Sequence, residues 1–589
     1  MARFHPSWLV LAFSAFLVIL FAIAGIRGIK DPVSSALQDD YGALSASHGL
    51  AVDINFGGAR GKVATGPRTT HPGIIFQAAS WVAYRLVTVG NENAYSRASA
   101  FFDRAESFFR LSVIISILLT LGGLFVWWRF ARHLGCGILP FITAMAYPFC
   151  LGEMWRYTTG TMGNESFALP LAALFALCVR KLTLSRLSEE GPHPESGKWA
   201  HIDWKQITLY ISFGFLTSVI ILLKLNYIVW FAAIPAGLIA LALTKSAPRG
   251  AARKCLIGFL FVVPPTLLFT YLQSLLFIGN EGFLEMLGRH TGIFMHSGYY
   301  GQGEAEIVSW ATVMTNARDF FAKSGHILVL PALVLLGAIC RRWRKLSAKC
   351  DTTSGLIALL IGVSLFGFGL DLLAAMKHYF PHYLIAGMVI LAIYLLIETN
   401  RWSRPAQVAI TLASILTCFH GWRTYQHGFA TATTVMAEVN AASQLTSTTG
   451  DQGFSIYSYG VRHPLGEMAW AVRMSNSVDA ARAWRDSQFG RNLHCMGWTL
   501  DEKIHWGRER LTIEDLPWNY VWVSDSFESN RDTRLKRQDE NETKDEFKSL
   551  GLRAEYFAGK VVRSHKVGPY RVLERDPKDF EKALSEQSE

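Results

Sequence analysis

Apolar runs of roughly 20 residues recur along the chain, and this feature limits most strongly how it can fold. A helix needs about 20 predominantly apolar residues to cross the hydrocarbon core of a bilayer. We therefore expect a polytopic α-helical membrane protein. The runs predict about eleven membrane-spanning helices, at residues 8–26, 110–128, 138–151, 163–178, 207–225, 227–243, 256–278, 327–340, 355–375, 383–397 and 408–419.

The composition supports the same class. Of the 589 residues, 51% are hydrophobic and only 17% are charged, whereas a soluble globular chain carries about 25% charged residues. This balance excludes a disordered protein, a coiled coil and an ordinary cytosolic enzyme. The first apolar run is longer than the roughly 7–15 residues of a signal-peptide core, so we interpret it as an uncleaved anchor.

The distribution of Lys and Arg predicts the orientation in the membrane. Basic residues follow every even-numbered span, and cytoplasmic loops are the ones enriched in such residues. We therefore expect a multi-pass protein of the cell inner (plasma) membrane with its N-terminus in the cytoplasm. An odd number of spans places the C-terminal part outside. The basic clusters lie at residues 129–132, 180–186, 245–254, 341–349 and 401–404.

Three long segments are predicted on the outer side: a first outer loop at 27–109, a second large loop at 279–326, and the C-terminal part. We divide the chain into a membrane domain, residues 1–420, and an extracytoplasmic domain, residues 421–589. Strand-like runs alternate with a helical stretch in the latter, which predicts a small α/β domain. The strand-like runs are 454–459, 520–524 and 570–573, and the helical stretch is near 464–474.

The first outer loop holds an acidic pair, Asp39-Asp40, directly beyond the first span. The spacing of apolar residues predicts a short amphipathic helix over 41–48 on the bilayer surface, and a second apolar helix over 74–89. Two interpretations of the pair stay open. It is either a solvated pair that the helix dipole favours or a general base that removes a proton from an attacking hydroxyl.

The order of these residues resembles the GT-C superfamily of glycosyltransferases. This group contains protein O-mannosyltransferases, aminoarabinose transferases and arabinofuranosyltransferases, which use sugars linked to polyprenyl phosphate. Asp39-Asp40 followed by Tyr41 is similar to the acidic motif after the family's first span. His71-Pro72 resembles its His-Pro-Pro element, although Gly73 stands at the second proline.

Four further segments, all within about residues 1–420, extend the resemblance. Arg110-Leu111-Ser112 is similar to the family's Arg-Leu-Pro element, and Leu223-Lys224 is similar to its Thr-Lys element. The segment from Arg156 to Glu165 resembles its short loop that ends in an acid. A basic and aromatic segment resembles the element before the late spans, and comprises Lys377, His378, His382 and Tyr383.

The resemblance implies an inverting transfer from a polyprenyl-phosphate sugar donor to an extracytoplasmic glycan, lipid or protein acceptor, with Asp39 or Asp40 as the catalytic base. It implies no cofactor and no nucleic-acid partner, and a divalent cation stays open. His290 and His296 do not have the spacing of a helical metal-ligand pair. The substrate-binding residues that it implies are His71, Arg110, Arg156, Glu165, Lys224, Lys377, His378, His382 and Tyr383.

Other interpretations stay open. Lys224 could extend to the lipid headgroups, and Asp371, inside the ninth span, is more readily explained by structural pairing than by catalysis. The chain could instead be a lipid-linked oligosaccharide ligase or polymerase, a secondary transporter or a non-catalytic membrane binding protein. Spans broken by Gly or Pro in corresponding halves, typical of transporters, are not evident in the sequence.

Overall fold

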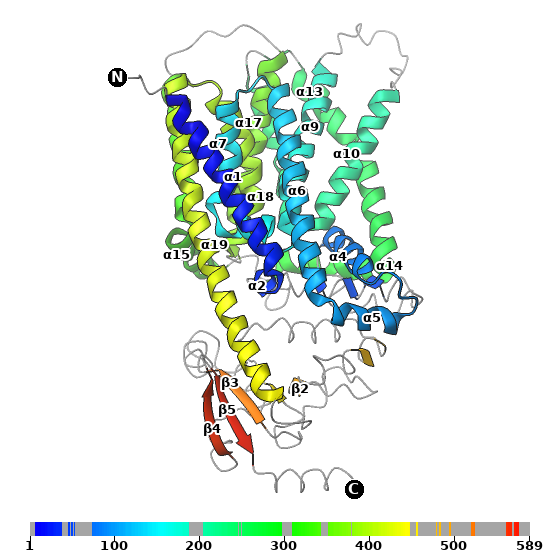
Figure 1. The fold of residues 1–589 in the computed structure, drawn as a ribbon. Helices are drawn as coiled ribbons and strands as arrows, with labels where there is room; N and C mark the ends of the chain where they lie inside the picture. Colours follow the sequence, from blue (N-terminus) through cyan, green and yellow to red (C-terminus); the bar gives the residue numbers. More distant parts are fainter. Residues whose placement is uncertain are drawn as a thin grey trace, which may run out of the picture. The chain divides into compact units, whose positions relative to one another are not determined.

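The computed structural model describes most of the membrane domain and parts of the remainder (Figure 1). The described part of the chain comprises residues 6–37, 45–46, 49–50, 52–53, 73–187, 204–244, 247–248, 250–296, 309–342, 352–377, 380–447, 455–456, 479, 482–483, 494–495, 520–524, 561–567 and 570–575.

Helices dominate the described residues. The first half of the chain forms α1 (Pro6–Lys30), α2 (Pro32–Leu37), α4 (Ile74–Val87), α5 (Ala94–Asp103), α6 (Ala105–His133), α7 (Ile138–Ala146), η1 (Tyr147–Cys150), α8 (Gly152–Thr159), η2 (Asn164–Phe167), α9 (Ala168–Leu187), α10 (Trp204–Leu223), η3 (Leu225–Ile228), α11 (Val229–Ala232), α12 (Ile234–Ala242), α13 (Ala251–Leu260) and α14 (Val263–Met295). The second half forms α15 (Trp310–Ser324), η4 (Gly325–Leu328), α16 (Val329–Arg342), α17 (Thr352–Lys377), η5 (Pro381–Leu384), α18 (Ile385–Thr399) and α19 (Arg404–Ser447).

Seven helical segments in the described part are long and apolar enough to cross a membrane, and one bent pair raises the number to eight. The chain is therefore a multi-pass membrane protein. Every predicted span coincides with a described helical segment, but the predicted count of about eleven is not confirmed. The seven segments are Ala105–His133, Asn164–Leu187, Trp204–Leu223, Ala251–Phe277, Trp310–Cys340, Ser354–Lys377 and Pro381–Thr399.

Two predicted spans are broken by local backbone chemistry. The run at 138–151 ends in the 3-10 turn η1, where Pro148 offers no N–H, and Leu151 is extended (φ −91°, ψ 136°) before α8 begins. The helices on either side of this break are bent by 97°. The run at 227–243 starts as a 3-10 turn after the extended Lys224 and is broken again ahead of Pro235, so only a short apolar helix results.

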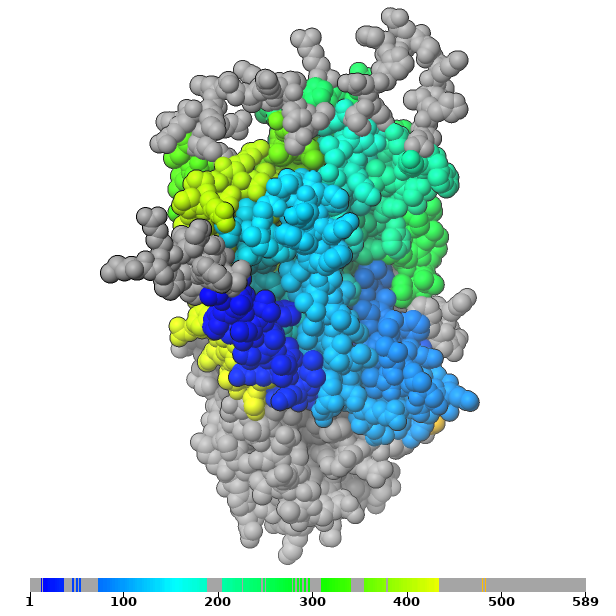
Figure 2. Space-filling model, turned by 45° about the horizontal axis from the view of Figure 1, so that its top comes forward, coloured from blue at the N-terminus to red at the C-terminus, as the bar shows by residue number. Residues whose placement is uncertain are grey.

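Helix α18 lies in the interior, because its residues Ile385–Thr399 are all buried. A polar contact ties it to α17, because the Ser364 hydroxyl donates to the Ile390 carbonyl at 2.6 Å and accepts from the Tyr394 amide at 3.1 Å. Peripheral helices are joined by close contacts as well. Figure 2 shows α1 and α6 side by side on one face, and a Cβ on Gly25 would lie 3.0 Å from the Ile117 side chain.

The described residues divide into two compact units. The first contains Met1–Pro32, Arg60–Ala78 and Arg110–His427, which include the membrane-spanning helices. The second contains Val33–Ala59, Ala79–Phe109 and Gly428–Glu589.

A five-stranded sheet in the second unit has the order β2-β1-β3-β5-β4. The pairs of β1 with β2 and β3 are parallel, and β5 runs antiparallel to β3 and β4. All three predicted strand-like runs contain strands. The predicted helical stretch near 464–474 lies outside the described residues, so the α/β class of this part stays a prediction. The strands are β1 (Ser455–Ile456), β2 (His494–Cys495), β3 (Tyr520–Ser524), β4 (Val561–Val567) and β5 (Tyr570–Arg575).

Candidate functional site

A buried ion pair lies at the ends of membrane helices, where Lys224 follows α10 and Glu165 lies in η2. The Lys224 ammonium donates to Glu165 Oε1. Both residues are almost fully buried, at 6% and 1% exposure. Removing two charges from water is costly, and ionisable groups inside membrane proteins usually mark functional sites. The pair is therefore the first candidate for a substrate site.

The same ammonium contacts the aromatic segment before α18. Lys224 Nζ lies 4.4 Å from the centroid of the Tyr383 ring, a cation–π distance. Two residues after Lys224, the Asn226 amide donates to the Tyr383 carbonyl at 3.1 Å. The His382 ring contacts that of Tyr383, with 4.5 Å between centroids. Three segments that are distant in the sequence therefore meet at Lys224.

Further buried polar groups lie around this pair. Asn164 precedes Glu165 and has no exposed surface, and neither Oδ1 nor Nδ2 has a partner in the described structure. The Tyr227 hydroxyl and Asp371 Oδ1 are likewise buried without a described partner. Glu165 and Asp371 both lie within electrostatic reach of Tyr227. Such atoms are rare in folded proteins, and a ligand or ordered water commonly explains them.

Asp371 has a structural role through its other oxygen. Oδ2 accepts from the Gly387 amide at 2.7 Å, in the first turn of α18. A Cβ on Gly387 would lie 2.6 Å from the same oxygen, so only glycine fits there. This contact agrees with the structural pairing favoured for Asp371 from the sequence.

The start of α4 reaches the same place. The Gly73 amide donates to the Leu222 carbonyl at 3.1 Å, and Gly73 has φ +130°, a backbone conformation that favours glycine. A Cβ at this position would lie 2.9 Å from Asn164 Oδ1. Beneath this contact, Ile74 and Leu222 form part of a buried apolar cluster. The stretch after the predicted His71-Pro72 element is thus anchored beside Asn164.

The structure brings together Glu165, Lys224, His382 and Tyr383 of the predicted site residues. The other described ones are Arg110, Lys377 and Arg156. Arg110 Nε donates to the Ile29 carbonyl at 3.1 Å, at the end of α1. The Lys377 carbonyl accepts from Asn316 at 3.0 Å, and Arg156 is half-buried in α8. Four predicted residues lie outside the described part: Asp39, Asp40, His71 and His378.

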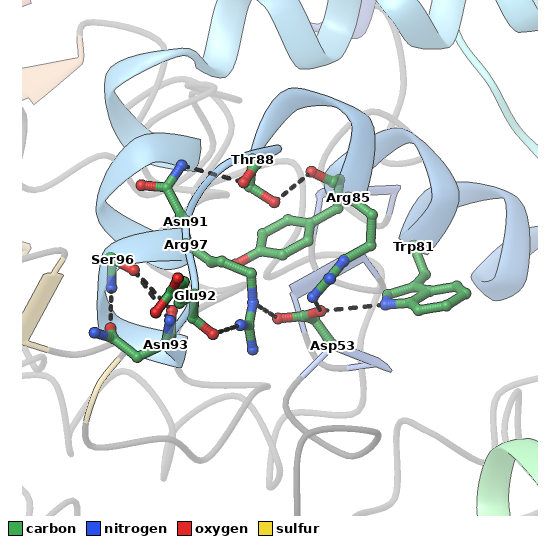
Figure 3. A network of polar contacts seen from close by, with 10 residues as sticks. Asp53, Trp81, Arg85, Thr88, Asn91, Glu92, Asn93, Ser96 and Arg97 are labelled. Carbon is green, nitrogen blue, oxygen red and sulfur yellow. Dashed lines mark hydrogen bonds and ion pairs between the residues drawn. The ribbon is translucent and has the colours of Figure 1, made fainter.

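A second polar cluster, which the sequence analysis missed, lies in the other unit (Figure 3). Its centre is Asp53, which is 2% exposed. Asp53 accepts from Arg97 Nε at 2.6 Å, from Arg85 at 3.1 Å and from the Trp81 indole at 3.3 Å. Arg97 also donates to the Glu92 carbonyl at 2.5 Å. A single Asp in an apolar stretch, Leu50-Ala51-Val52-Asp53-Ile54, was the available signal.

This cluster holds a segment of the first outer loop against α4. A Cβ on Gly49 would lie 2.9 Å from the Ser80 carbonyl, and the Ser45 and Ser80 hydroxyls are 3.1 Å apart. Tyr84 is buried at this contact, and its burial raises the pKa of its hydroxyl. The segment begins five residues after Asp40 in the sequence.

No group of three or more His, Cys, Asp or Glu residues that could hold a metal ion occurs within the described ranges.

Comparisons with known proteins give only distant matches. No family model matches the chain, and no curated protein matches it. The solved structures that are similar include two of ArnT from Cupriavidus metallidurans. The one bound to undecaprenyl phosphate is 12% identical with a TM-score of 0.47, covering 96% of this chain and 99% of that chain. The apo structure is also 12% identical, with a TM-score of 0.45, covering 97% and 98%.

Proposed function

We propose that this protein is a GT-C-like membrane glycosyltransferase that moves a sugar from a polyprenyl-phosphate donor to an extracytoplasmic glycan, lipid or protein acceptor. The observation that carries the proposal is the buried Lys224–Glu165 pair with its surrounding polar atoms. Both residues belong to segments whose sequence resembles GT-C elements. A polar centre inside a multi-pass membrane protein is suited to a substrate that combines a lipid tail with a charged head.

In this proposal Lys224 stabilises the phosphate of the donor. An ammonium paired with phosphate makes a strong charge-assisted contact in a water-poor interior. Glu165 holds Lys224 in position before the donor arrives, and the phosphate then competes with Glu165 for the ammonium. His382 and Tyr383 lie against this site and would contact the same head group.

The proposed chemistry is a direct displacement. The acceptor hydroxyl attacks the anomeric carbon, and Asp39, with Asp40 as its alternative, accepts the hydroxyl proton. The bond between the anomeric carbon and the phosphate oxygen breaks, and its electron pair leaves with the phosphate. A single displacement inverts the anomeric carbon, and this scheme uses no cofactor. The basic loops support an inner-membrane orientation with a cytoplasmic N-terminus.

A secondary transporter is the second candidate, because the described spans include interruptions. The helices around Leu151 are bent by 97°, and α14 is interrupted at Gly279 (φ 72°, ψ 178°). Transporters use discontinuous helices to build sites near the middle of the membrane. The buried charges alone fit either activity, so an assay must separate them.

The proposal is tested with purified protein in lipid vesicles, supplied with radiolabelled polyprenyl-phosphate sugars and candidate acceptors. We expect transfer of label to an acceptor and its loss in Asp39→Asn or Asp40→Asn. Asp103→Asn is the matched control, since Asp103 is exposed at the end of α5. Retained transfer in both single variants would remove the acidic pair from the mechanism. Uptake of solute without transfer would favour the transporter.

The buried pair is tested in the same assay. Replacing only Lys224 would leave Glu165 as an uncompensated buried charge, so the useful variant is Glu165→Gln with Lys224→Met. We expect this neutral pair to fold and to lose transfer. The control changes an exposed pair, Asp319→Asn with Lys323→Met, whose side chains are 49% and 62% exposed. Normal transfer by the neutral buried pair would contradict the role given to Lys224.

A further inference from the structure

Asn164 is the buried polar side chain that the structure explains least. It has no exposed surface, and both its carbonyl oxygen and its amide nitrogen lack a partner among the described residues. The two residues that follow it in the same turn each have a partner. Glu165 pairs with Lys224, and the Ser166 hydroxyl donates to the Tyr157 carbonyl at 2.6 Å. A donor and an acceptor buried together without partners indicate that a ligand supplies both.

Gly73 packs directly against this amide. A Cβ there would lie 2.9 Å from Asn164 Oδ1 and 3.5 Å from Nδ2. Any other residue would therefore place its side chain against the Asn164 amide. The backbone of Gly73 is itself held by the Leu222 carbonyl, directly before Lys224 in the chain. Asn164 is thus packed against the same segments that hold the ion pair.

The chemistry of the amide identifies the kind of group that fits it. A carboxamide presents an acceptor oxygen and a donor NH₂ side by side. Phosphate oxygens only accept, so a phosphate would satisfy Nδ2 and leave Oδ1 unpaired. A sugar hydroxyl both donates and accepts, and neighbouring hydroxyls satisfy both atoms of Asn164. The charge of Lys224, by contrast, suits phosphate.

We infer that Asn164 binds hydroxyl groups of the transferred sugar, while Lys224 binds the phosphate of the same donor. This inference rests on the proposed function and deepens it, because it assigns the recognition of the sugar to one residue. Asn164 forms part of an Asn-Glu-Ser pattern that resembles a glycosylation site, but its complete burial excludes that role in the folded chain.

The test is a binding measurement with two probes on the full-length protein in lipid nanodiscs. The probes are polyprenyl phosphate alone and the same lipid carrying a hexose or a pentose. The variant is Asn164→Leu, which keeps the size of the side chain and removes both polar atoms. We expect affinity for the preferred glycosylated lipid to fall roughly 10- to 100-fold, as for two lost hydrogen bonds. Affinity for polyprenyl phosphate should not change.

Thermal unfolding without lipid donor separates this role from a structural one. Removing a buried polar group that has no partner costs no hydrogen bond, so Asn164→Leu should be at least as stable as the wild type. The control is Asn400→Leu, because Asn400 Oδ1 accepts from the Gly137 amide at 3.1 Å. This control should lower the unfolding temperature and leave the preference for the glycosylated lipid intact.

The outcomes are distinguishable. An unchanged preference for the glycosylated lipid in Asn164→Leu overturns the inference, as does a marked loss of stability in that variant. Wild-type protein that transfers sugar but binds both lipids equally also overturns it, while the proposed function stands. Absence of both transfer and binding of either lipid overturns the proposed function together with the inference.

Discussion

The Asp53 cluster offers the most direct test of how the first outer loop is held in place. The perturbation is Asp53→Asn, which keeps the shape of the side chain and removes its charge. Asp53 accepts from two guanidinium groups, so the variant leaves both of them without a carboxylate. The two ion pairs differ greatly in solvent exposure, and this difference determines how much stability the variant should lose.

The pair of Arg97 with Asp53 should contribute most of the lost stability. The side chains of Arg97 and Asp53 are 9% and 3% exposed, and removing one partner of a buried pair costs about 3–5 kcal/mol. The Arg85 side chain is 47% exposed, so its pair adds at most about 1 kcal/mol. Asparagine keeps one acceptor oxygen, and Arg97 keeps its bond to the Glu92 carbonyl. We therefore expect a local loss of about 2–3 kcal/mol.

Hydrogen exchange measures this loss where it occurs. Local opening of α4 and α5 should increase by roughly 30- to 150-fold, since each 1.4 kcal/mol is about tenfold in an equilibrium constant. Exchange in α18, which belongs to the other unit, should not change. A second substitution, Arg97→Gln added to Asp53→Asn, should recover part of the loss because no buried charge is then left unpaired.

Two results would refute this reasoning. Unchanged exchange in both α4 and α5 would show that the buried pair does not hold the segment. Equal acceleration in α18 would show that the variant unfolds the protein as a whole. Asp319→Asn provides the matched control, because its partner Lys323 lies 3.4 Å away on an exposed face and the loss of such a pair has little effect.

Two further predictions follow from single contacts. Gly387→Ala places a methyl group 2.6 Å from Asp371 Oδ2. We therefore expect a lower unfolding temperature and a loss of about 1–3 kcal/mol in the free energy of unfolding. An unchanged unfolding temperature would contradict the close contact. Burial raises the pKa of the Cys136 thiol, between α6 and α7, to about 11. A raised pKa leaves little thiolate at pH 8, so maleimide should label Cys136 far more slowly than the exposed Cys340. Labelling of Cys136 should rise only as the pH approaches the pKa, and equal rates at pH 8 would show that the thiol is not buried.

The positions of the membrane helices were readable from the sequence, because a long apolar run is a local property. The sequence did not show whether such a run forms one straight helix. The run at 138–151 is interrupted after η1, where the Tyr147 hydroxyl donates to the Ile327 carbonyl at 3.2 Å. A contact across 180 residues helps hold this turn, and no local pattern reveals it. The predicted run at 138–151 is therefore a broken span in the described part.

The candidate site divides in the same way. The order of the motifs singled out Glu165, Lys224 and Tyr383 separately. It did not show that their side chains meet. Their contacts span 59 and more residues of sequence. Asn164 entered the sequence analysis only as part of the loop from Arg156 to Glu165, since nothing in the sequence shows that its amide is buried without a partner. Asp53 was missed because its guanidinium partners lie 32 and 44 residues further along.

The sequence by itself determined that the chain crosses a membrane many times, where its helices lie and which residue types are available for chemistry. The length of an apolar run and the bias in charge are sums over neighbouring residues, so both can be read from the sequence without knowledge of the fold. The tertiary structure alone decided that Lys224 is neutralised by Glu165 inside the protein and that Gly73 packs against Asn164. Burial and partnership depend on residues that are distant in the chain, and only packing brings those residues together.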